Sequence, residues 1–489
     1  MGSLLSAPVS RTKSLDDCQT SQTESCKRLK MTVSCDDNSR LISSLPDEIS
    51  LQILARVPRI CYLSMKLVAK NWKAALSSNE VYQLRKELGL TEEWLYILVK
   101  VERENTLMWL GLDPVSRKWQ RLPPIPNVPP EEESSSTALI GSWMWNVLGS
   151  SVKIADYIRG WMGRRNVFER IRLCGCATGV VDGCLYVVGG FSTASAMKSV
   201  WRYDPCLNQW REVRSMTTGR AFCKTGLLNN KLYVVGGVNL NGGSLTPLLS
   251  AEVFDPCTEQ WSEVPTMPFA KADLLAIDLL ADMLKPMATG MTPYMGKLYV
   301  PQSLYCWPFF VDVGGQIYDP ETNSWFEMPP GMGDGWPARQ AGTKLSVIVG
   351  GDLFALEPSN STDGAKIKRY DFLKDEWNIV VETVPVHDFT NSHSRYLLAS
   401  LLGKVHVITK DADNNTTILQ ADLQDQTCPS TSRSSSTLAS SSHGNASSSS
   451  ASSSRGSFDL SEGEMNAWKV IARKNFGTAE LVSCQSLNV

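Results

Sequence analysis

The chain has 489 residues, which is long enough for two or three domains, and its hydrophobic content of 43% is ordinary for a globular protein. A formal net charge of −2 gives no electrostatic argument for binding nucleic acid or an acidic membrane. Thirteen cysteines without a C-x-x-C pair, beside only four histidines, argue against a structural zinc site and predict reduced thiols in the cytoplasm or nucleus.

The N-terminal segment, residues 1–40, is predicted to be disordered because it is rich in Ser, Thr, Asp and Gln and has no apolar periodicity. Its start lacks the basic region and the apolar length of a signal peptide, and no run of the sequence predicts an integral membrane segment. Gly2 and Ser6 match the N-myristoylation pattern. Lipidation at Gly2 therefore stays open, although one myristoyl chain binds a membrane only marginally.

Residues 41–90 are predicted to form a small all-α domain. Pro46 fits a first helical turn, and the acidic residues that follow it suit the helix dipole. Pro58 should end this helix. Two apolar faces are expected, one made by Ile49, Ile53 and Leu54 and the other by Leu63, Leu67, Val68 and Trp72.

Residues 91–489 change to short β-rich runs broken by Gly, Pro and Asn, which is typical of an all-β repeat. An aspartate is followed six positions later by a tryptophan, with a turn between them, in five copies. The pairs are Asp113 and Trp119, Asp204 and Trp210, Asp255 and Trp261, Asp319 and Trp325, and Asp371 and Trp377. The Asp side chain can bond amides two residues on, and the Trp supplies a large apolar body. Because catalysis has no need of five copies, we interpret these residues as architectural.

Two copies of the repeat are clearest, and each predicts four strands. A glycine pair ends the second strand in each copy, at Gly189 and Gly190 and at Gly236 and Gly237. Residues that tolerate positive φ, Asp182–Gly183 and Asn229–Asn230, predict a tight turn before that strand. The intervals between tryptophans indicate two inserts, one at 126–170 and a Ser-rich, disordered one at 428–460.

The first unit lacks an innermost strand, because residues 94–99 already resemble a second strand. One strand is left over at the other end of the chain, at residues 478–487. We expect it to join the first unit and close a six-bladed ring, which protects the sheet edges that an open array would expose.

The helical segment resembles an F-box over residues 45–49, 53–58 and 66–72, with Ala69 where many F-boxes have Cys. The repeats resemble kelch repeats, and together they are similar to the plant F-box/kelch-repeat family. The resemblance implies a mainly β fold, a six-bladed kelch β-propeller preceded by a small all-α F-box domain. It also implies a non-catalytic substrate-recognition subunit of an SCF-type E3 ubiquitin ligase. The F-box would bind a Skp-type adaptor and thereby a cullin, and the propeller would bind the protein to be ubiquitinated.

Two sets of binding residues follow from this resemblance. The adaptor-binding candidates are Leu45, Pro46, Ile49, Leu54, Leu63, Val68 and Trp72, of which some must form the internal core. Substrate recognition is expected on long loops that share one face of the propeller, residues 191–199, 238–250, 301–313 and 357–366, together with the inserts at 126–170 and 266–286. The exposed aromatic candidates on them and nearby are Phe191, Tyr305, Trp307, Phe309 and Trp336, and packing inside a blade is the alternative for each.

Three other interpretations stay open. The helices could merely cap the propeller, and the propeller could be an interaction scaffold without a ubiquitin-ligase role. It could also resemble a copper oxidase, but copper needs several converging imidazole or tyrosinate ligands. His443 lies in the Ser-rich insert and His406 in a predicted strand, and His387 and His393 alone make a poor site. We therefore expect no metal and no cofactor, and the sequence does not identify the substrate.

Overall fold

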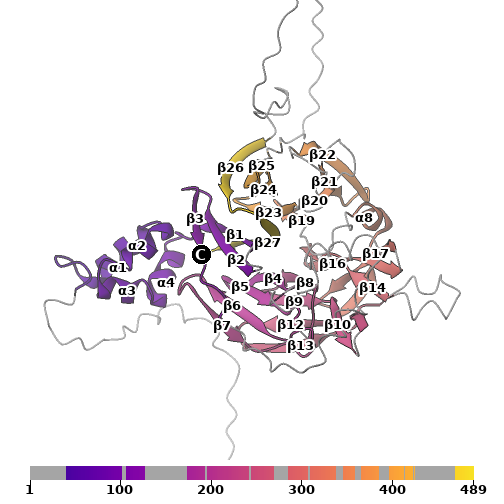
Figure 1. The fold of residues 1–489 in the computed structure, drawn as a ribbon, viewed down its shortest axis with the longest axis horizontal. Coiled ribbons are helices and arrows are strands. Elements are labelled where there is room, and N and C mark those ends of the chain that lie inside the picture. The colour runs from indigo at the N-terminus through magenta and orange to yellow at the C-terminus, as the bar shows by residue number, and fades with distance from the viewer. Residues whose placement is uncertain are drawn as a thin grey trace, which may run out of the picture.

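A computed structural model describes two connected parts of the chain, a helical unit and a β-propeller. The described residues are 40–101, 106–126, 173, 175–192, 195–241, 244–268, 285–306, 309–336, 345–357, 365–384, 396–411, 413–421, 423 and 468–489. Gly2, the rest of the predicted N-terminal disordered segment, and nearly all of both predicted inserts lie outside these residues. Figure 1 shows the ring of blades face-on with the helical unit beside it.

The helical unit contains α1 (Asp47–Arg56), η1 (Arg59–Cys61), α2 (Tyr62–Met65), α3 (Lys70–Ala75) and α4 (Asn79–Glu87). Pro46 is the N-cap of α1, and the chain becomes extended at Val57, just before Pro58. The unit has its own apolar core, formed by the buried residues Leu54, Ala55, Tyr62, Leu76, Val81 and Tyr82. Propensity and the proline positions therefore place the first helix where the sequence predicts it.

Blade one is built from both ends of the propeller sequence. Its strand order is β27 (Ala479–Asn488), β1 (Glu93–Val101), β2 (Thr106–Asp113) and β3 (Lys118–Arg121). Strand β27 pairs with β1 along its whole length, from Asn488 opposite Glu93 to Ala479 opposite Val101. The C-terminal strand thus supplies the innermost strand that the first repeat lacks, and the predicted six-bladed propeller is confirmed.

Blades two and three carry the clearest repeats. Their strands are β4 (Ala177–Val181), β5 (Cys184–Val188), β6 (Val200–Asp204) and β7 (Gln209–Val213), and then β8 (Lys224–Leu228), β9 (Lys231–Val235), β12 (Ala251–Asp255) and β13 (Gln260–Val264). The predicted tight turns have positive φ, as at Asn229 (51°) and Asn230 (54°). Gly237 has φ +87°, and a Cβ atom there would lie 2.6 Å from the carbonyl oxygen of Ala221. The second glycine of the pair is therefore required by contact between neighbouring backbones.

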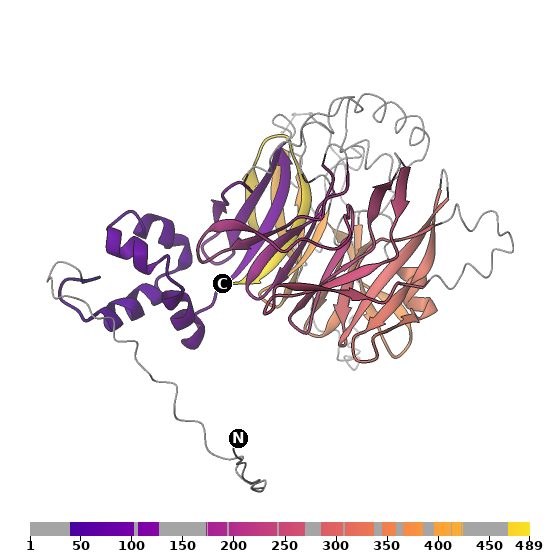
Figure 2. The same ribbon diagram turned by 90° about the horizontal axis from the view of Figure 1, so that it is seen from below.

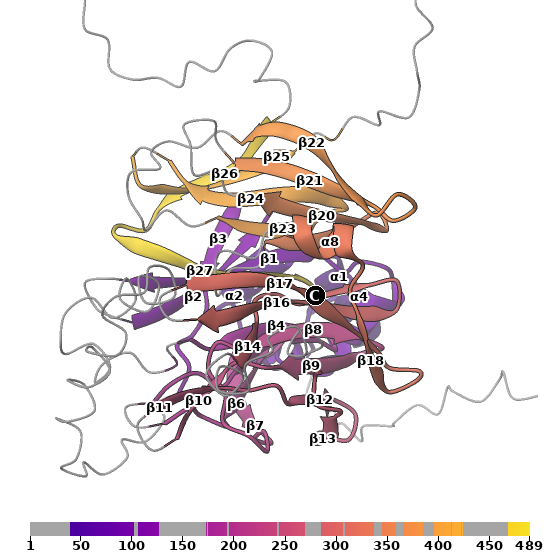
Figure 3. The same ribbon diagram turned by 90° about the vertical axis from the view of Figure 1, so that its right-hand side faces the viewer.

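Blades four to six complete the ring, with weaker repeats. Blade four has β14 (Lys285–Ala288), β15 (Thr292–Tyr294), β16 (Lys297–Cys306), β17 (Phe309–Asp319) and β18 (Ser324–Glu327). Blade five has β19 (Ser346–Val349), β20 (Asp352–Glu357), β21 (Ala365–Asp371) and β22 (Glu376–Val384), and blade six has β23 (Leu397–Leu401), β24 (Lys404–Lys410), β25 (Asn415–Ala421) and β26 (Trp468–Asn475). The short helix α8 (Pro330–Gly335) contacts both β17 and β22 and so lies between blades four and five (Figure 3).

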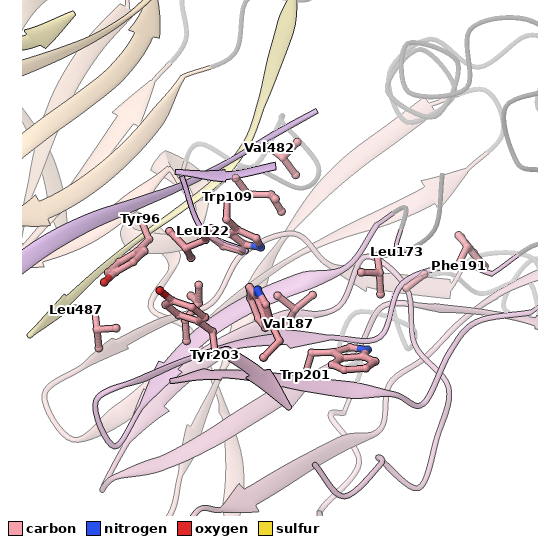
Figure 4. Close-up of a cluster of buried hydrophobic side chains, with 14 of the residues drawn as sticks. Tyr96, Trp109, Leu122, Leu173, Val187, Phe191, Trp201, Tyr203, Val482 and Leu487 are labelled. Atoms are coloured by element: carbon pink, nitrogen blue, oxygen red, sulfur yellow. The ribbon is translucent and has the colours of Figure 1, made fainter. Parts of the chain in front are cut away.

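The hydrophobic core of the propeller lies between neighbouring blades. The cluster between blades one and two is drawn in Figure 4, where Tyr96 and Trp109 from blade one face Val187 and Tyr203 from blade two. A second cluster joins blades one and six, and β27 contributes Leu481 to it. Closure of the ring is therefore made by apolar packing as well as by the β27–β1 ladder.

The repeated Asp and Trp residues make the same contacts in successive blades. In all five copies an Asp Oδ1 accepts the amide of the residue two positions later; Asp255 Oδ1, for example, lies 2.9 Å from the amide nitrogen of Cys257. The indole N–H of Trp261 donates to the carbonyl of Arg214, 2.7 Å away at the end of the preceding blade. The indoles that donate toward the preceding blade in this way are those of Trp210, Trp261, Trp325, Trp377 and Trp468; the acceptor of Trp377 is Met332 in α8, the short helix after blade four. Each Asp forms a turn, and each of these tryptophans joins two blades.

Two segments predicted as long loops are instead regular hairpins. Residues 238–250 contain β10 (Val238–Asn241) paired with β11 (Ser244–Pro247). Residues 301–313 continue β16 and β17 beyond the blade, with Cys306 opposite Phe309. Main-chain pairing in these segments satisfies the backbone groups that a loop would leave to water, so the loop prediction was wrong for both.

Candidate functional site

The described residues of the helical unit leave six large apolar side chains exposed to solvent: Leu88, the C-cap of α4, is 38% exposed, and the other five lie on α1 and in the segment from α2 to the start of α3. Helix α1 turns Leu54 into the core at 1% exposure, whereas Ile49 and Ile53, four residues apart on one face, are 44% and 41% exposed. The segment from α2 to the start of α3 adds Leu63 at 42%, Leu67 at 86% and Val68 at 66%. We call Ile49, Ile53, Leu63, Leu67 and Val68 the exposed apolar surface.

The predicted adaptor-binding residues divide between this surface and its support. Ile49, Leu63 and Val68 belong to the exposed apolar surface; Pro46 is exposed and Leu45 is half-buried. Leu54 is one of the candidates that form the internal core of the unit, because its position on α1 faces α4.

Two further observations complete the comparison with the predicted set. Trp72 is half-buried, and its indole N–H donates to the carbonyl of Leu41, 2.6 Å away, which ties the segment before α1 to α3. Ile53 and Leu67 were absent from the predicted set although both lie on the predicted apolar faces. Their spacing from Ile49 and Leu63, four residues in each case, was the available signal.

Arg85 holds the helical unit in shape from within. Its guanidinium is 2% exposed and donates to the carbonyls of Ala55, Val57 and Leu90 and to Oε1 of Glu92, at 2.6–2.8 Å. It therefore donates hydrogen bonds to carbonyl groups at the C-terminal end of α1, which the helix itself leaves without a donor. This contact keeps α1 in the orientation that exposes Ile49 and Ile53.

The strands of a four-stranded blade divide their connections between two faces of the propeller. Connections between second and third strands, and between blades, share what we call the upper face; turns between first and second and between third and fourth strands share the lower face. The hairpin β10–β11 and the extended ends of β16 and β17 lie on the upper face. The helical unit contacts the lower face, at the β6–β7 turn, as Figure 2 shows from the side.

The predicted aromatic candidates of the propeller are not an exposed set. Phe191 is 6% exposed and packs edge-on against Phe222, with ring centroids 6.0 Å apart. Trp336 is 5% exposed and packs edge-on against Trp377, at 5.6 Å. Both residues therefore follow the packing alternative rather than the exposed one, because each ring fills space between structural elements. Trp307 and the side chains of Tyr305 and Phe309 lie outside the described residues.

The described residues offer no support for a metal centre. Within the described ranges, no group of three or more His, Cys, Asp and Glu side chains is arranged to hold a metal ion. His406 is 1% exposed in β24, where burial lowers its pKa below the ordinary value; the other three histidines lie outside the described residues. None of the described helices has the length and apolar character that a bilayer crossing requires.

Comparisons with known proteins agree with this architecture. The F-box domain model matches residues 42–84, and the kelch motif model matches residues 172–217 and 219–268, which are the positions of blades two and three. An F-box/kelch-repeat protein of Arabidopsis thaliana is 53% identical over the full length of both chains. A second Arabidopsis F-box/kelch-repeat protein is 27% identical over 64% of each chain, and the Arabidopsis F-box protein AFR is 25% identical over 65% of this chain and 68% of its own. The chain therefore belongs to the F-box/kelch-repeat family.

Proposed function

We propose that this protein is the substrate-recognition subunit of an SCF-type E3 ubiquitin ligase. The observation that carries the proposal is the exposed apolar surface on a helical unit that matches the F-box domain model. The unit already has a core of its own, so these side chains are not needed to fold it. Large apolar side chains gathered on a small unit indicate a partner that removes them from water.

The Skp-type adaptor would bind the exposed apolar surface. Helical segments that present apolar residues three and four positions apart fit a hydrophobic groove on a partner. Leu45 and Pro46 would extend the contact at the start of α1. Leu54 and Trp72 would support it from beneath, because they are buried and half-buried. A cullin would join through the adaptor and would make no direct contact that the proposal requires.

The propeller would bind the protein to be ubiquitinated, with the upper face as the recognition surface. There the hairpins β10–β11 and β16–β17 stand on rigid blades, which suits recognition because a rigid scaffold lowers the entropy cost of binding. The chain itself would be non-catalytic, and other subunits would transfer ubiquitin. An interaction scaffold without a ligase role is the alternative that the experiment below must separate.

The test places charges on the exposed apolar surface. In Leu67→Asp with Val68→Asp, two side chains that are 86% and 66% exposed become carboxylates. We expect loss of co-precipitation with the Skp-type adaptor, because an apolar groove would have to bury unpaired charges. The melting temperature should stay unchanged, since neither side chain packs in the core. Leu45→Ala with Pro46→Ala should weaken the same interaction.

The matched control is Phe372→Asp with Leu373→Asp, an adjacent apolar pair on the β21–β22 turn that is 50% and 94% exposed. This pair should leave adaptor binding unchanged. Adaptor binding that survives the charges at Leu67 and Val68 would contradict the proposed surface. If the unchanged chain recovers neither adaptor nor cullin from plant extract, the scaffold alternative replaces the ligase proposal.

A further inference from the structure

The boundary between the helical unit and the propeller contains a buried arginine that no step of the proposed function uses. Arg59 opens η1, belongs to the helical unit, and is only 5% exposed. The chain passes from α4 into β1 through residues 88–92, so this short connection alone would leave the two parts free to rotate. Arg59 bridges the same boundary away from that connection.

The partners of the Arg59 guanidinium belong to two different blades. Nη1 donates to the hydroxyl oxygen of Tyr96 in β1, 3.0 Å away, and Nη2 donates to the carbonyl oxygen of Pro205 in the β6–β7 turn, 2.5 Å away. The guanidinium carbon lies 4.9 Å from the centroid of the Trp94 ring, a cation–π contact. One side chain of the helical unit is thus joined to blades one and two at once.

Glu92 fastens the connection itself. Its Oε1 accepts from the backbone amide of Arg59 at 3.1 Å and from Arg85 at 2.6 Å, and its Oε2 accepts from the indole N–H of Trp94 at 3.1 Å. Its main chain pairs with Val489, at the end of the closing strand. Glu92 therefore ties the helical unit to the two inner strands of blade one.

A second contact prevents rotation about Arg59. The hydroxyl group of Tyr82 in α4 lies 2.8 Å from the carbonyl oxygen of Cys206, and Cys206 packs against the core of the helical unit. On the other side, Ile60 packs against the cluster between blades one and two, which contains Tyr96 and Tyr203 (Figure 4). The contacts at η1, at α4 and at Glu92 lie at separate places along the boundary. Together they define one orientation of the helical unit relative to the propeller.

Arginine suits this position because its planar guanidinium holds several acceptors in a set geometry and stays charged when buried. Hydrogen bonds from a charged group are stronger than those between neutral groups. We propose that Arg59 is a positioning residue that holds the F-box and the propeller as one rigid body. The inference rests on the proposed function in one respect: it gives a bound adaptor a constant position relative to the upper face, and hence relative to a bound substrate.

The test measures the distance between the two parts in the full chain. Spectroscopic labels are placed through genetically encoded side chains at Gln83, exposed on α4, and at Leu373, exposed on blade five, so that the native cysteines stay unlabelled. The unchanged protein should give one narrow distance distribution. Arg59→Ala should broaden it, Arg59→Lys should broaden it less, and Tyr96→Phe, which removes a single acceptor, should have the smallest effect.

Arg56→Ala is the matched control, because Arg56 lies three residues earlier, is exposed and, among the described residues, donates to the carbonyl of Gln52 within α1. It should leave the distribution narrow. Adaptor affinity and the melting temperature of the propeller should be the same for all variants, which separates positioning from general destabilisation. With a label on the bound adaptor in place of Gln83, Arg59→Ala should broaden the adaptor-to-propeller distribution as well.

A narrow distribution in Arg59→Ala would overturn the proposal. If Arg59→Ala fails to fold, Arg59→Lys and Tyr96→Phe decide, and distributions as narrow as the unchanged protein's in both would again overturn it. Failure of the adaptor to bind the unchanged chain would instead overturn the proposed function. The Gln83-to-Leu373 distances in the chain alone would still judge the role of Arg59, so the two failures can be told apart.

Discussion

The propeller and the helical unit differ in how completely their apolar side chains are buried. In the propeller, strand β1 is buried from Trp94 to Lys100, and its side chains fill the spaces on both sides of the blade. In the helical unit, adjacent residues of one helix differ, with Leu54 in the core at 1% exposure and Ile53 at 41%. The apolar side chains of the inner strands pack within the ring, whereas the helical unit leaves part of its apolar side chains exposed.

Exposed apolar residues also occur on the propeller, but they are distributed differently. Val115 and Met295, at 83% and 58%, lie on turns of blades one and four, which are opposite each other in the ring, and the other exposed apolar residues are spread over further turns, with Phe372 and Leu373 as an adjacent pair. Isolated exposed residues of this kind are normal on protein surfaces. Six within one small helical unit are not, and this difference in density favours the helices as the location of the proposed partner surface.

The largest effect is expected when the closing strand β27 is removed, because the propeller is then incomplete. A chain that ends at residue 477 lacks β27, whose buried side chains Leu481, Val482 and Leu487 pack between blades. We expect the loss to exceed the net stability of a typical domain, about 5–15 kcal/mol, so that the propeller no longer unfolds cooperatively. Thermal unfolding followed by near-ultraviolet circular dichroism measures this.

Asn488→Ala is the control for that truncation, because Asn488 is exposed at the end of the same strand. Its melting temperature should match that of the unchanged protein. A truncated chain that melts at the same temperature as the full one would show that the β27–β1 ladder does not close the ring.

A pair of adjacent residues sharpens the comparison inside the helical unit. Leu54→Ala should reduce the free energy of unfolding by about 2–5 kcal/mol, because it leaves a cavity in the core. Ile53→Ala should change it by less than about 1 kcal/mol, since that side chain is 41% exposed. Chemical denaturation of the full chain, followed at the helical unit, measures both changes in the free energy of unfolding. Equal losses at the two positions would mean that Ile53 is core, and the exposed apolar surface would then lose a member.

The sequence predicts those features that repeat or that depend on neighbouring residues. The Asp-to-Trp spacing locates the blades, and the missing inner strand before residue 94 together with the extra strand at the C-terminus predicts closure. These inferences succeed because turn formation and strand pairing depend on local patterns.

Side-chain direction and long-range contacts are what the sequence could not supply. Phe191 and Trp336 were named as exposed candidates because they lie between predicted strands. In the structure each packs against an aromatic ring that is distant in the sequence, Phe222 and Trp377 respectively. Arg59 and Pro205 are 146 residues apart, and no spacing rule relates them. The prediction that 301–313 is a loop failed because β16 and β17 pair with each other beyond the blade, which a polar or aromatic composition does not exclude.

The smallest expected effect concerns a single junction between blades. Trp261→Phe keeps an aromatic ring against Phe254, whose centroid lies 5.1 Å away, but removes the N–H that donates to Arg214. We expect a loss of about 0.5–1.5 kcal/mol, the net value of one hydrogen bond, because water can reach the freed carbonyl. Urea unfolding with an unchanged m-value would measure it, and Phe326→Leu, which alters a half-exposed ring on β18, is the control. A loss of several kcal/mol would show that the tryptophan acts through ring size rather than through its hydrogen bond, and the five indole contacts would then be a consequence of packing rather than a separate source of stability.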